Sequence, residues 1–326
     1  MAAIRTPAVS SAARCLGLAM LAWPSAALAT FSIAACDPAG NCGVAVATNN
    51  LAVGASVPYA QARVGALVSQ FETNPAYGPR GLALMAAGSS PEHTIKALLD
   101  ADGDFDGQTI AARQIGVVDA KGRASAYTGA EAQDSAWAGA VQGDGYSLQG
   151  NGLAGPQVLA AMQRAFDASD GALAERLMRA LEAGESAGGQ STGRMSAALL
   201  VKTVEGGWQD VDLRVDGAAE PVRDLRRLTD QHHALQAIAR AERDVRAGRK
   251  ADARAAIKTA LALSHRWDRI WRRAARLAMT MGDNDSALEY LGVLRTVNPP
   301  WALMEIEDQL YRPLHANPLF ASWRKK

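Results

Sequence analysis

Thr30 is the residue whose type and position most directly suggest chemistry, because it follows the pattern of a secretory signal. A threonine hydroxyl needs a base to become a nucleophile, and an N-terminal threonine carries one on its own Cα, an α-amine that titrates near ~8. The upstream pattern consists of Arg5 and Arg14, an apolar run at residues 15–23, Pro24, and the small pair Ala27 and Ala29 that signal peptidase recognises. Cleavage after Ala29 would expose that amine. The alternative is that Thr30 is only the residue at which trimming ended.

Composition indicates a soluble globular protein. Of the 326 residues, 48% are hydrophobic and 21% are charged, and the part that follows residue 29 is long enough for one large domain or two smaller ones. No apolar run in that part approaches the ~20 residues that a membrane span needs. We therefore expect a periplasmic or secreted bacterial protein with no membrane span after signal removal, no nucleic acid partner and no cofactor.

Charge is unevenly distributed along the chain, although the net charge is only +1. Residues 30–229 contain 15 Lys and Arg against 22 Asp and Glu, a net charge of −7, whereas residues 230–326 contain 17 against 11, a net charge of +6. This difference predicts two bodies of opposite sign that dock on each other, or a basic part that faces an anionic surface.

Cysteine usage also suits an exported protein. Cys15 leaves with the signal, so that Cys36 and Cys42 remain as an even pair on either side of a turn-rich segment, residues 37–41. In an oxidising compartment this spacing predicts a disulfide across a hairpin, with two buried thiols as the alternative. We expect no metal site, because no further cysteine follows and the five histidines are not spaced as ligands.

Hydrophobic periodicity predicts a layered α+β domain in which helices cover the outer faces of paired sheets. The predicted strands are residues 30–35, 43–48, 63–70, 114–119 and 124–128, two short strands around Trp137 and Tyr146, and residues 195–203 and 208–215. The predicted helices are residues 81–88, 90–101, 155–167 and 171–183. The first hairpin would place Thr30 on a strand inside a sheet, and thus in a rigid position.

Two loops of this domain have a composition that suggests binding. Residues 73–80 form a turn rich in Pro and Gly at a helix start, where free backbone N–H groups can hold a carboxylate or an oxyanion, unless it is an ordinary capped loop. Residues 102–107 match the first half of a calcium loop, but position twelve is Arg113 instead of Glu. We interpret this second segment as a solvated acidic loop, with a calcium site as the alternative.

The last part of the chain contains an internal repeat. Gly248, Ala253 and Ile257 recur 34 residues later as Gly282, Ala287 and Leu291, and Trp271 and Pro299 occupy positions expected in a tetratricopeptide-type repeat. Two repeats are few for a solenoid that is stable alone. We therefore expect an all-helical tail, residues 229–326, that packs on the first domain.

Several motifs in the first domain, taken together, resemble the bacterial family known as domain of unknown function 1028. They are Thr30-Phe31-Ser32-Ile33, residues 43–46, 52–54, 73–81, 114–119, 137–139 and 149–151, and Gly193-Arg194-Met195 with the strand that follows. The resemblance covers residues 30–228 in order. This family is similar to the N-terminal nucleophile (Ntn) hydrolases, which implies a four-layer αββα sandwich and a catalytic Thr30. Cys36, Cys42 and Asn49 depart from the usual pattern.

The resemblance implies roles for residues around Thr30. Thr30 would attack an amide to form an acyl-enzyme, Thr48 would orient its amine, and the oxyanion would be held near Asn74 or by Asn151. Tyr77, Arg80 and Arg194 would bind a carboxylate of a small-molecule amide substrate, with a structural anchoring role as the alternative for each.

A non-catalytic function is the alternative for the whole chain. The protein would then be a periplasmic binding or adaptor protein that keeps the Ntn scaffold, with a helical tail that recruits a peptide or cell-wall partner. The absence of Lys or His close to Thr30 in the sequence agrees with this alternative.

We predict that the exported protein begins at Thr30, because the residues before it match a signal peptidase site. Mass spectrometry of the protein isolated from the periplasm of an expressing bacterium will show Thr30 as the first residue. Any additional residue would convert the amine into an amide, and this result would contradict the nucleophile hypothesis.

Overall fold

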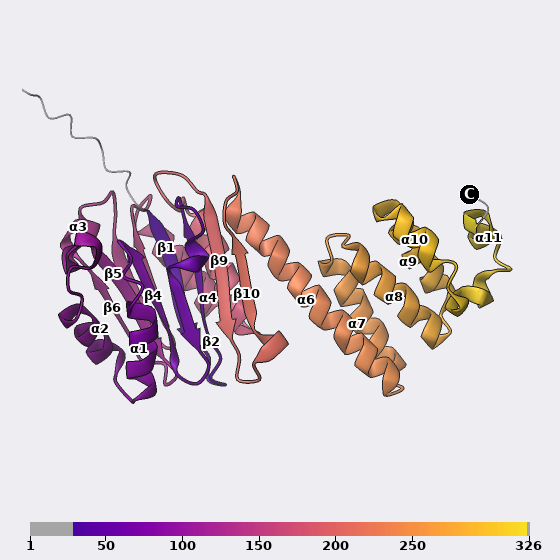
Figure 1. Cartoon of the computed structure of the whole chain (residues 1–326), viewed down its shortest axis with the longest axis horizontal. Helices are drawn as coiled ribbons and strands as arrows, with labels where there is room; N and C mark the ends of the chain where they lie inside the picture. The colour runs from indigo at the N-terminus through magenta and orange to yellow at the C-terminus, as the bar shows by residue number, and fades with distance from the viewer. Residues whose placement is uncertain (1–28, 325–326) are drawn as a thin grey trace, which may run out of the picture.

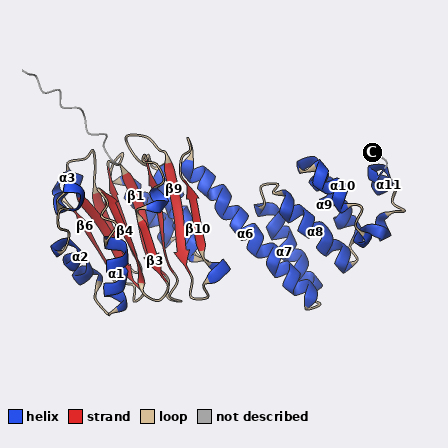
Figure 2. Cartoon of the chain, viewed as in Figure 1, coloured by secondary structure: helices blue, strands red, loops and turns tan. Residues whose placement is uncertain are grey.

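The computed structural model describes residues 29–324, so the predicted signal segment up to Leu28 lies outside the described residues. Figure 1 shows a sheet-containing part formed by the first two thirds of the chain, followed by a helical tail that ends far from it. Figure 2 shows that strands are confined to the first part. The predicted mixed α/β class and the helical C-terminal region are confirmed.

The first part contains two antiparallel sheets. One has six strands in the order β10-β9-β2-β1-β8-β7, so β1 is central, and the other has four in the order β3-β4-β5-β6. The strands of the first sheet are β1 (Thr30–Cys36), β2 (Cys42–Thr48), β7 (Gly139–Gly143), β8 (Tyr146–Asn151), β9 (Ser196–Lys202) and β10 (Val211–Val215). The strands of the second are β3 (Pro58–Gln61), β4 (Gly65–Phe71), β5 (Arg113–Asp119) and β6 (Ala124–Thr128).

Helices cover the outer face of each sheet, and the inner faces pack on each other. On β1, Phe31 and Ile33 contact α4 (Gln157–Asp167) and α5 (Leu173–Ser186), whereas Ala34 belongs to the core between the sheets. Helices α1 (Tyr77–Ala86) and α2 (Pro91–Asp100) cover the four-stranded sheet. A short α3 (Ala130–Gln133) precedes β7. Side chains alternate in direction along a strand, so β1 is buried on both of its faces.

Two of the differences from the sequence-based prediction have a local cause. Strand β3 was not predicted; it contains Pro58 and lies at a sheet edge, where the missing N–H of proline is tolerated. Helix α1 begins at Tyr77, four residues earlier than expected, because Pro79 lies in its first turn, where no intrahelical N–H bond is required.

The predicted disulfide between Cys36 and Cys42 is present. The two residues face each other at the end of the β1–β2 hairpin, with their Cα atoms 4.1 Å apart. Asp37 orders the turn between them, since its Oδ1 accepts hydrogen bonds of 3.0 Å from the backbone N–H groups of Ala39 and Asn41.

A buried ion pair anchors the segment that resembles a calcium loop. Arg113 Nε donates to Asp102 Oδ2 at 3.1 Å, and Arg113 Nη2 donates to the carbonyl oxygens of Phe105 and Gln108, both at 2.8 Å. Asp102 is only 7% exposed, so the expectation of a solvated loop is wrong for this residue. The guanidinium at position twelve of the pattern binds the oxygen atoms that a cation would otherwise require. Among residues 29–324 no cluster of three or more His, Cys, Asp or Glu side chains is arranged to hold a metal ion.

Helix α6 (Pro221–Arg246) connects the two parts without interruption and runs through residues 228 and 229, where the domain boundary was predicted. Its start contributes Val222 and Leu225 to the core between the six-stranded sheet and its helices. Its second half contributes Ala234 and Ile238 to a core shared with the following helices. No helix between residues 29 and 324 is both long and apolar enough to cross a membrane.

The tail has a structural repeat that matches the sequence repeat. Its helices are α7 (Lys250–Leu263), α8 (Asp268–Met281), α9 (Asn284–Val297), α10 (Pro299–Glu305) and α11 (Pro318–Arg324). Helix α9 begins and ends 34 residues after α7 does. Gly248 and Gly282, which follow α6 and α8, have φ angles of 74° and 80°, a left-handed conformation that favours glycine at a helix end.

The Asp102–Arg113 pair predicts a pH-dependent stability. Burial raises the pKa of Asp102, but hydrogen bonds from Arg113, Tyr77 and Asn74 outweigh it and hold the pKa below its ordinary value. The contribution is therefore complete above about pH 4, the pKa range of an unfolded aspartate, and is lost as the pH falls through the lower pKa of the folded state. We expect Asp102→Asn to lower the free energy of unfolding at pH 7 by about 3 kcal/mol, because it leaves a buried guanidinium without a counter-charge.

Urea unfolding at pH 7 and at pH 3 measures both effects. The matched control is Asp100→Asn, which breaks an exposed 2.6 Å pair with Lys96 and should cost less than about 1 kcal/mol. Equal stabilities of the two variants at pH 7 would contradict a structural role for the buried pair.

The continuity of α6 predicts where the chain can be shortened. A fragment of residues 30–229 keeps Val222 and Leu225 and should fold, whereas a fragment of residues 30–220 loses both and should be about 3–5 kcal/mol less stable. Circular dichroism and urea unfolding of the two fragments provide the measurement. An insoluble 30–229 fragment would show that the tail belongs to the same core.

Candidate functional site

Thr30 lies in a row of polar residues at one end of four neighbouring strands of the six-stranded sheet. The antiparallel register places Thr30 beside Thr48 on β2 and Asn151 on β8, and it places Thr48 beside Ser196 on β9. Residues paired in this way have side chains on the same face, here the face toward the second sheet. All four are buried, and Thr30 is 4% exposed. The structure thus brings three predicted site residues together: Thr30, Thr48 and Asn151.

The hydroxyl of Thr48 has hydrogen-bond partners both as a donor and as an acceptor. It donates to the carbonyl oxygen of Ala29 at 2.7 Å, and it accepts from the backbone N–H of Asn50 at 3.3 Å. Its Oγ1 lies 3.1 Å from Oγ1 of Thr30. Because the single proton of Thr48 points to Ala29, Thr30 is the donor in this contact. The hydroxyl of Thr30 is therefore oriented by a neighbouring residue of the same sheet.

Behind Thr30, a chain of buried amide and hydroxyl groups connects the two sheets. Ser32 Oγ donates to Gln70 Oε1 at 2.6 Å, and Gln70 Nε2 donates to Gln114 Oε1 at 2.7 Å. Gln149 Nε2 donates to Ser32 Oγ at 2.7 Å. These glutamines were not identified from the sequence. The signal in the sequence was a glutamine within a predicted strand that also contains several apolar residues.

A glycine permits the close approach of the sheets at this network. A Cβ atom at Gly116 on β5 would lie 1.8 Å from Oε1 of Gln149 on β8. Any side chain at this position would therefore displace the amide of Gln149 and its hydrogen bond to Ser32.

Asn151 ends this network beside Thr30. Its Nδ2 donates to Gln114 Oε1 at 2.8 Å, and Gln114 Nε2 in turn donates to the carbonyl oxygen of Gly150 at 2.9 Å, which defines the orientation of both amides. Asn151 Oδ1 is buried and has no hydrogen-bond partner among the described residues. The site thus presents an unused acceptor next to the start of β1.

Asn74 and Tyr77 lie in a different cluster, around Asp102. Asn74 Nδ2 and the Tyr77 hydroxyl donate to Asp102 Oδ2 at 3.0 and 2.5 Å. Asn74 Oδ1 accepts from the backbone N–H of Ala76 at 3.0 Å. Burial and the neighbouring carboxylate raise the pKa of Tyr77 far above its ordinary value, so it remains a neutral donor. In the part of the chain that the structure describes, neither side chain forms a hydrogen bond to Thr30, Thr48 or Asn151.

The two predicted arginines are on the surface. Arg80 is exposed on α1. Arg194 is about half exposed and pairs with Glu185 at 2.7 Å and with Glu220 at 3.1 Å. Arg194 belongs to residues 190–195, which border the site: Asn49 Nδ2 donates to the carbonyl oxygen of Thr192, and the N–H of Met195 donates to that of Thr48, both at 2.9 Å.

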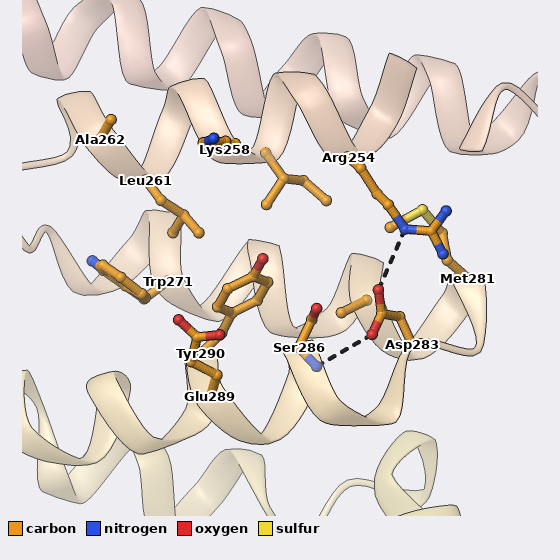
Figure 3. A pocket seen from close by; sticks show the side chains of 12 residues that line it. Arg254, Lys258, Leu261, Ala262, Trp271, Met281, Asp283, Ser286, Glu289 and Tyr290 are labelled. Carbon is orange, nitrogen blue, oxygen red and sulfur yellow. Dashed lines mark hydrogen bonds and ion pairs between the residues drawn. The ribbon is translucent and has the colours of Figure 1, made fainter. Parts of the chain in front are cut away.

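A cleft of about 450 Å³ lies in the tail, away from Thr30. Figure 3 shows that α7, α8 and α9 line it, with Trp271 and Tyr290 side by side and Arg254 paired with Asp283 at one end, at 3.3 Å. Lys258 and Glu289 also line it. The cleft is therefore apolar within and carries charges of both signs at its rim.

Comparison with known proteins agrees with the sequence resemblance. The model described as "Family of unknown function (DUF1028)" matches residues 30–225. Among solved structures, the crystal structure of protein SPO2555 from Silicibacter pomeroyi, of the same family model, is similar, with 34% sequence identity and a TM-score of 0.56. The match covers 62% of this chain and 85% of that chain. No curated protein matches the chain. Since the family model spans more than half of the sequence, the protein belongs to the DUF1028 family.

Proposed function

We propose that this protein, after removal of residues 1–29, is an N-terminal nucleophile hydrolase that cleaves a small amide with Thr30. The observation that carries the proposal is the position of Thr30. It begins the central strand β1, its side chain faces the inner side of the two sheets, and its Oγ1 lies 3.1 Å from Oγ1 of Thr48. The two sheets with helices on both outer faces agree with the αββα sandwich of Ntn hydrolases.

The proposed reaction needs only groups at this site and water. The α-amine takes the proton of the Thr30 hydroxyl, directly or through a water, while Oγ1 forms a bond to the acyl carbon. The proton passes to the leaving nitrogen as the C–N bond breaks, and water then hydrolyses the ester. The unpaired Oδ1 of Asn151 is an acceptor for an N–H of the amine, and Thr48 orients the hydroxyl.

The remaining predicted residues have supporting roles in this proposal. Asn74 and Tyr77 shape the loop of residues 73–77 through Asp102. Arg194, beside the residues that border the site, is the surface cation that a substrate carboxylate would meet, although it must then exchange one of its glutamate partners. No metal or cofactor takes part.

We place the protein in the periplasm or outside the cell. The Cys36–Cys42 disulfide supports this location, because disulfides persist in oxidising compartments. The signal-like segment before Thr30 supports it independently.

A binding function of the tail is the second candidate. The 34-residue offset between α7 and α9 supports a tetratricopeptide-like repeat, and the cleft of Figure 3 offers an apolar interior for a peptide or cell-wall partner. In this alternative the first domain is a non-catalytic scaffold, and the tail alone engages the partner.

Variants of Thr30 test the catalytic proposal. In a chain that begins at residue 30, Thr30→Ala keeps the amine and the strand but removes the nucleophile, so we expect turnover of small amides to fall at least about 10³-fold with little change in stability. Thr30→Ser should retain partial activity, because it lacks only the γ-methyl that limits χ1. An alanine added before Thr30 should be as damaging as Thr30→Ala. Release of amine from a panel of small amides is the measurement.

Thr280→Ala, an exposed threonine of α8, is the matched control and should keep full activity. Full turnover by Thr30→Ala on any amide that the wild type cleaves would contradict the proposal. The binding function of the tail would then become the better explanation of the protein.

A further inference from the structure

Ala29, the residue before the proposed nucleophile, is buried and accepts hydrogen bonds from two side chains. It is 1% exposed, and its carbonyl oxygen accepts two side-chain hydrogen bonds, one from Thr48 Oγ1 at 2.7 Å and one from Gln190 Nε2. Both donors come from outside β1, from the end of β2 and from the segment before β9. Two donors from separate elements thus converge on one carbonyl oxygen beside Thr30.

Removal of Ala29 would leave these donors without their acceptor. Gln190 Nε2 would keep only the carbonyl oxygen of Ala47, at 3.2 Å, and Gln190 Oε1 is already a buried acceptor without a partner among the described residues. Buried polar groups without partners cost free energy. The processed chain therefore offers a preformed site for another oxygen atom of the carbonyl or carboxylate type.

The same donors can reach the acyl group of a substrate. The nitrogen and Oγ1 of Thr30 are attached to adjacent carbon atoms, Cα and Cβ, so an acyl carbon bound to Oγ1 lies close to the position that the Ala29 carbonyl carbon occupies. Donors arranged before the reaction around a developing oxyanion stabilise it with little reorganisation. Thr48 and Gln190 are therefore suited to hold the oxygen of the acyl group that Thr30 attacks.

The site accommodates only a small acyl side chain. A Cβ atom at Gly152 would lie 2.7 Å from Cβ of Ala29, and Gly152 has a φ of 59°, a conformation that disfavours other residues. The methyl group of Ala29 therefore fills the space beside a glycine. A branched or aromatic acyl group would meet the backbone of Gly152.

We propose that the position of Ala29 is the acyl subsite of the mature protein, with Thr48 and Gln190 as its carbonyl donors, and that it selects amides of acyl groups such as acetyl, propionyl and alanyl over those of branched and aromatic acyl groups. This inference rests on the proposed function of Thr30. The reaction then releases a short-chain carboxylate and the amine of the substrate.

Turnover of a series of p-nitroanilides that differ only in the acyl group tests the selectivity. For a chain that begins at Thr30, kcat/KM should be highest for acetyl, propionyl and alanyl and at least about 10-fold lower for the branched pivaloyl group and the aromatic benzoyl group. Gln190→Glu, which keeps the shape but replaces the donor with an acceptor, should lower kcat about 100-fold for every substrate. Gln61→Ala, an exposed glutamine of β3, is the matched control and should leave the rates unchanged.

A binding measurement that requires no catalysis separates the hydrolase proposal from the acyl-subsite proposal. Calorimetric titration of the Thr30→Ala chain with sodium propionate should show binding that Gln190→Glu abolishes and that benzoate does not reproduce. Circular dichroism verifies that each variant is folded. If propionate binds in this way but no anilide is hydrolysed by the unsubstituted chain, the hydrolase proposal fails and the subsite stands. If anilides are hydrolysed without dependence on acyl size or on Gln190, the subsite is wrong and Thr30 remains the nucleophile.

Discussion

The register of β1 between β2 and β8 is the constraint on which the site depends. It aligns Thr30 with Thr48 on one side and with Asn151 on the other, and it directs all three side chains between the sheets. A shift of one residue would turn Thr30 toward α4 and α5 and would bring Phe31 into the polar layer. Because β1 is buried on both faces, such a shift would disrupt two cores at once, and the position of Thr30 is accordingly well defined.

The polar layer between the sheets adds a second constraint. Three glutamines and a serine, none of them more than 1% exposed, form hydrogen bonds that link β1 and β8 with β4 and β5: Ser32, Gln70, Gln114 and Gln149. A buried amide without partners would be costly, so these bonds favour one relative placement of the sheets over its alternatives. Asn151 is bonded to the same network, and its orientation beside Thr30 is thereby coupled to the packing of the whole sandwich.

Burial of the Ala29–Thr30 bond also restricts how the proposed cleavage after Ala29 can occur. Both residues are almost inaccessible in the folded chain, and β1 is paired on both of its sides. A separate peptidase can therefore reach this bond only before β1 joins the sheet. The proposed function therefore requires cleavage before the chain folds, and in that proposal the donors around Ala29 become available as the processed chain folds.

The sequence by itself determined the features that depend on local pattern. The alternation around residues 30–48 and the two cysteines on either side of a turn were sufficient to predict the first hairpin and its disulfide, and the 34-residue repeat was sufficient to predict the paired helices of the tail. Thr30 and Thr48 could be grouped in advance because they belong to the same hairpin. In each case the interacting residues are close in sequence, and their spacing reflects a known backbone geometry.

Only the tertiary structure showed what depends on distant segments. Gln114 and Gln190 reach the site from residues far along the chain, and no periodicity reports which buried amide faces which partner. The same limit applies to α6, whose two halves pack in different cores although its helical pattern is uniform, and to Asn74 and Tyr77, whose loop is organised by Asp102 and Arg113. Side-chain hydrogen bonds across layers are decided by how the sheets and helices pack, and a one-dimensional pattern does not contain that information.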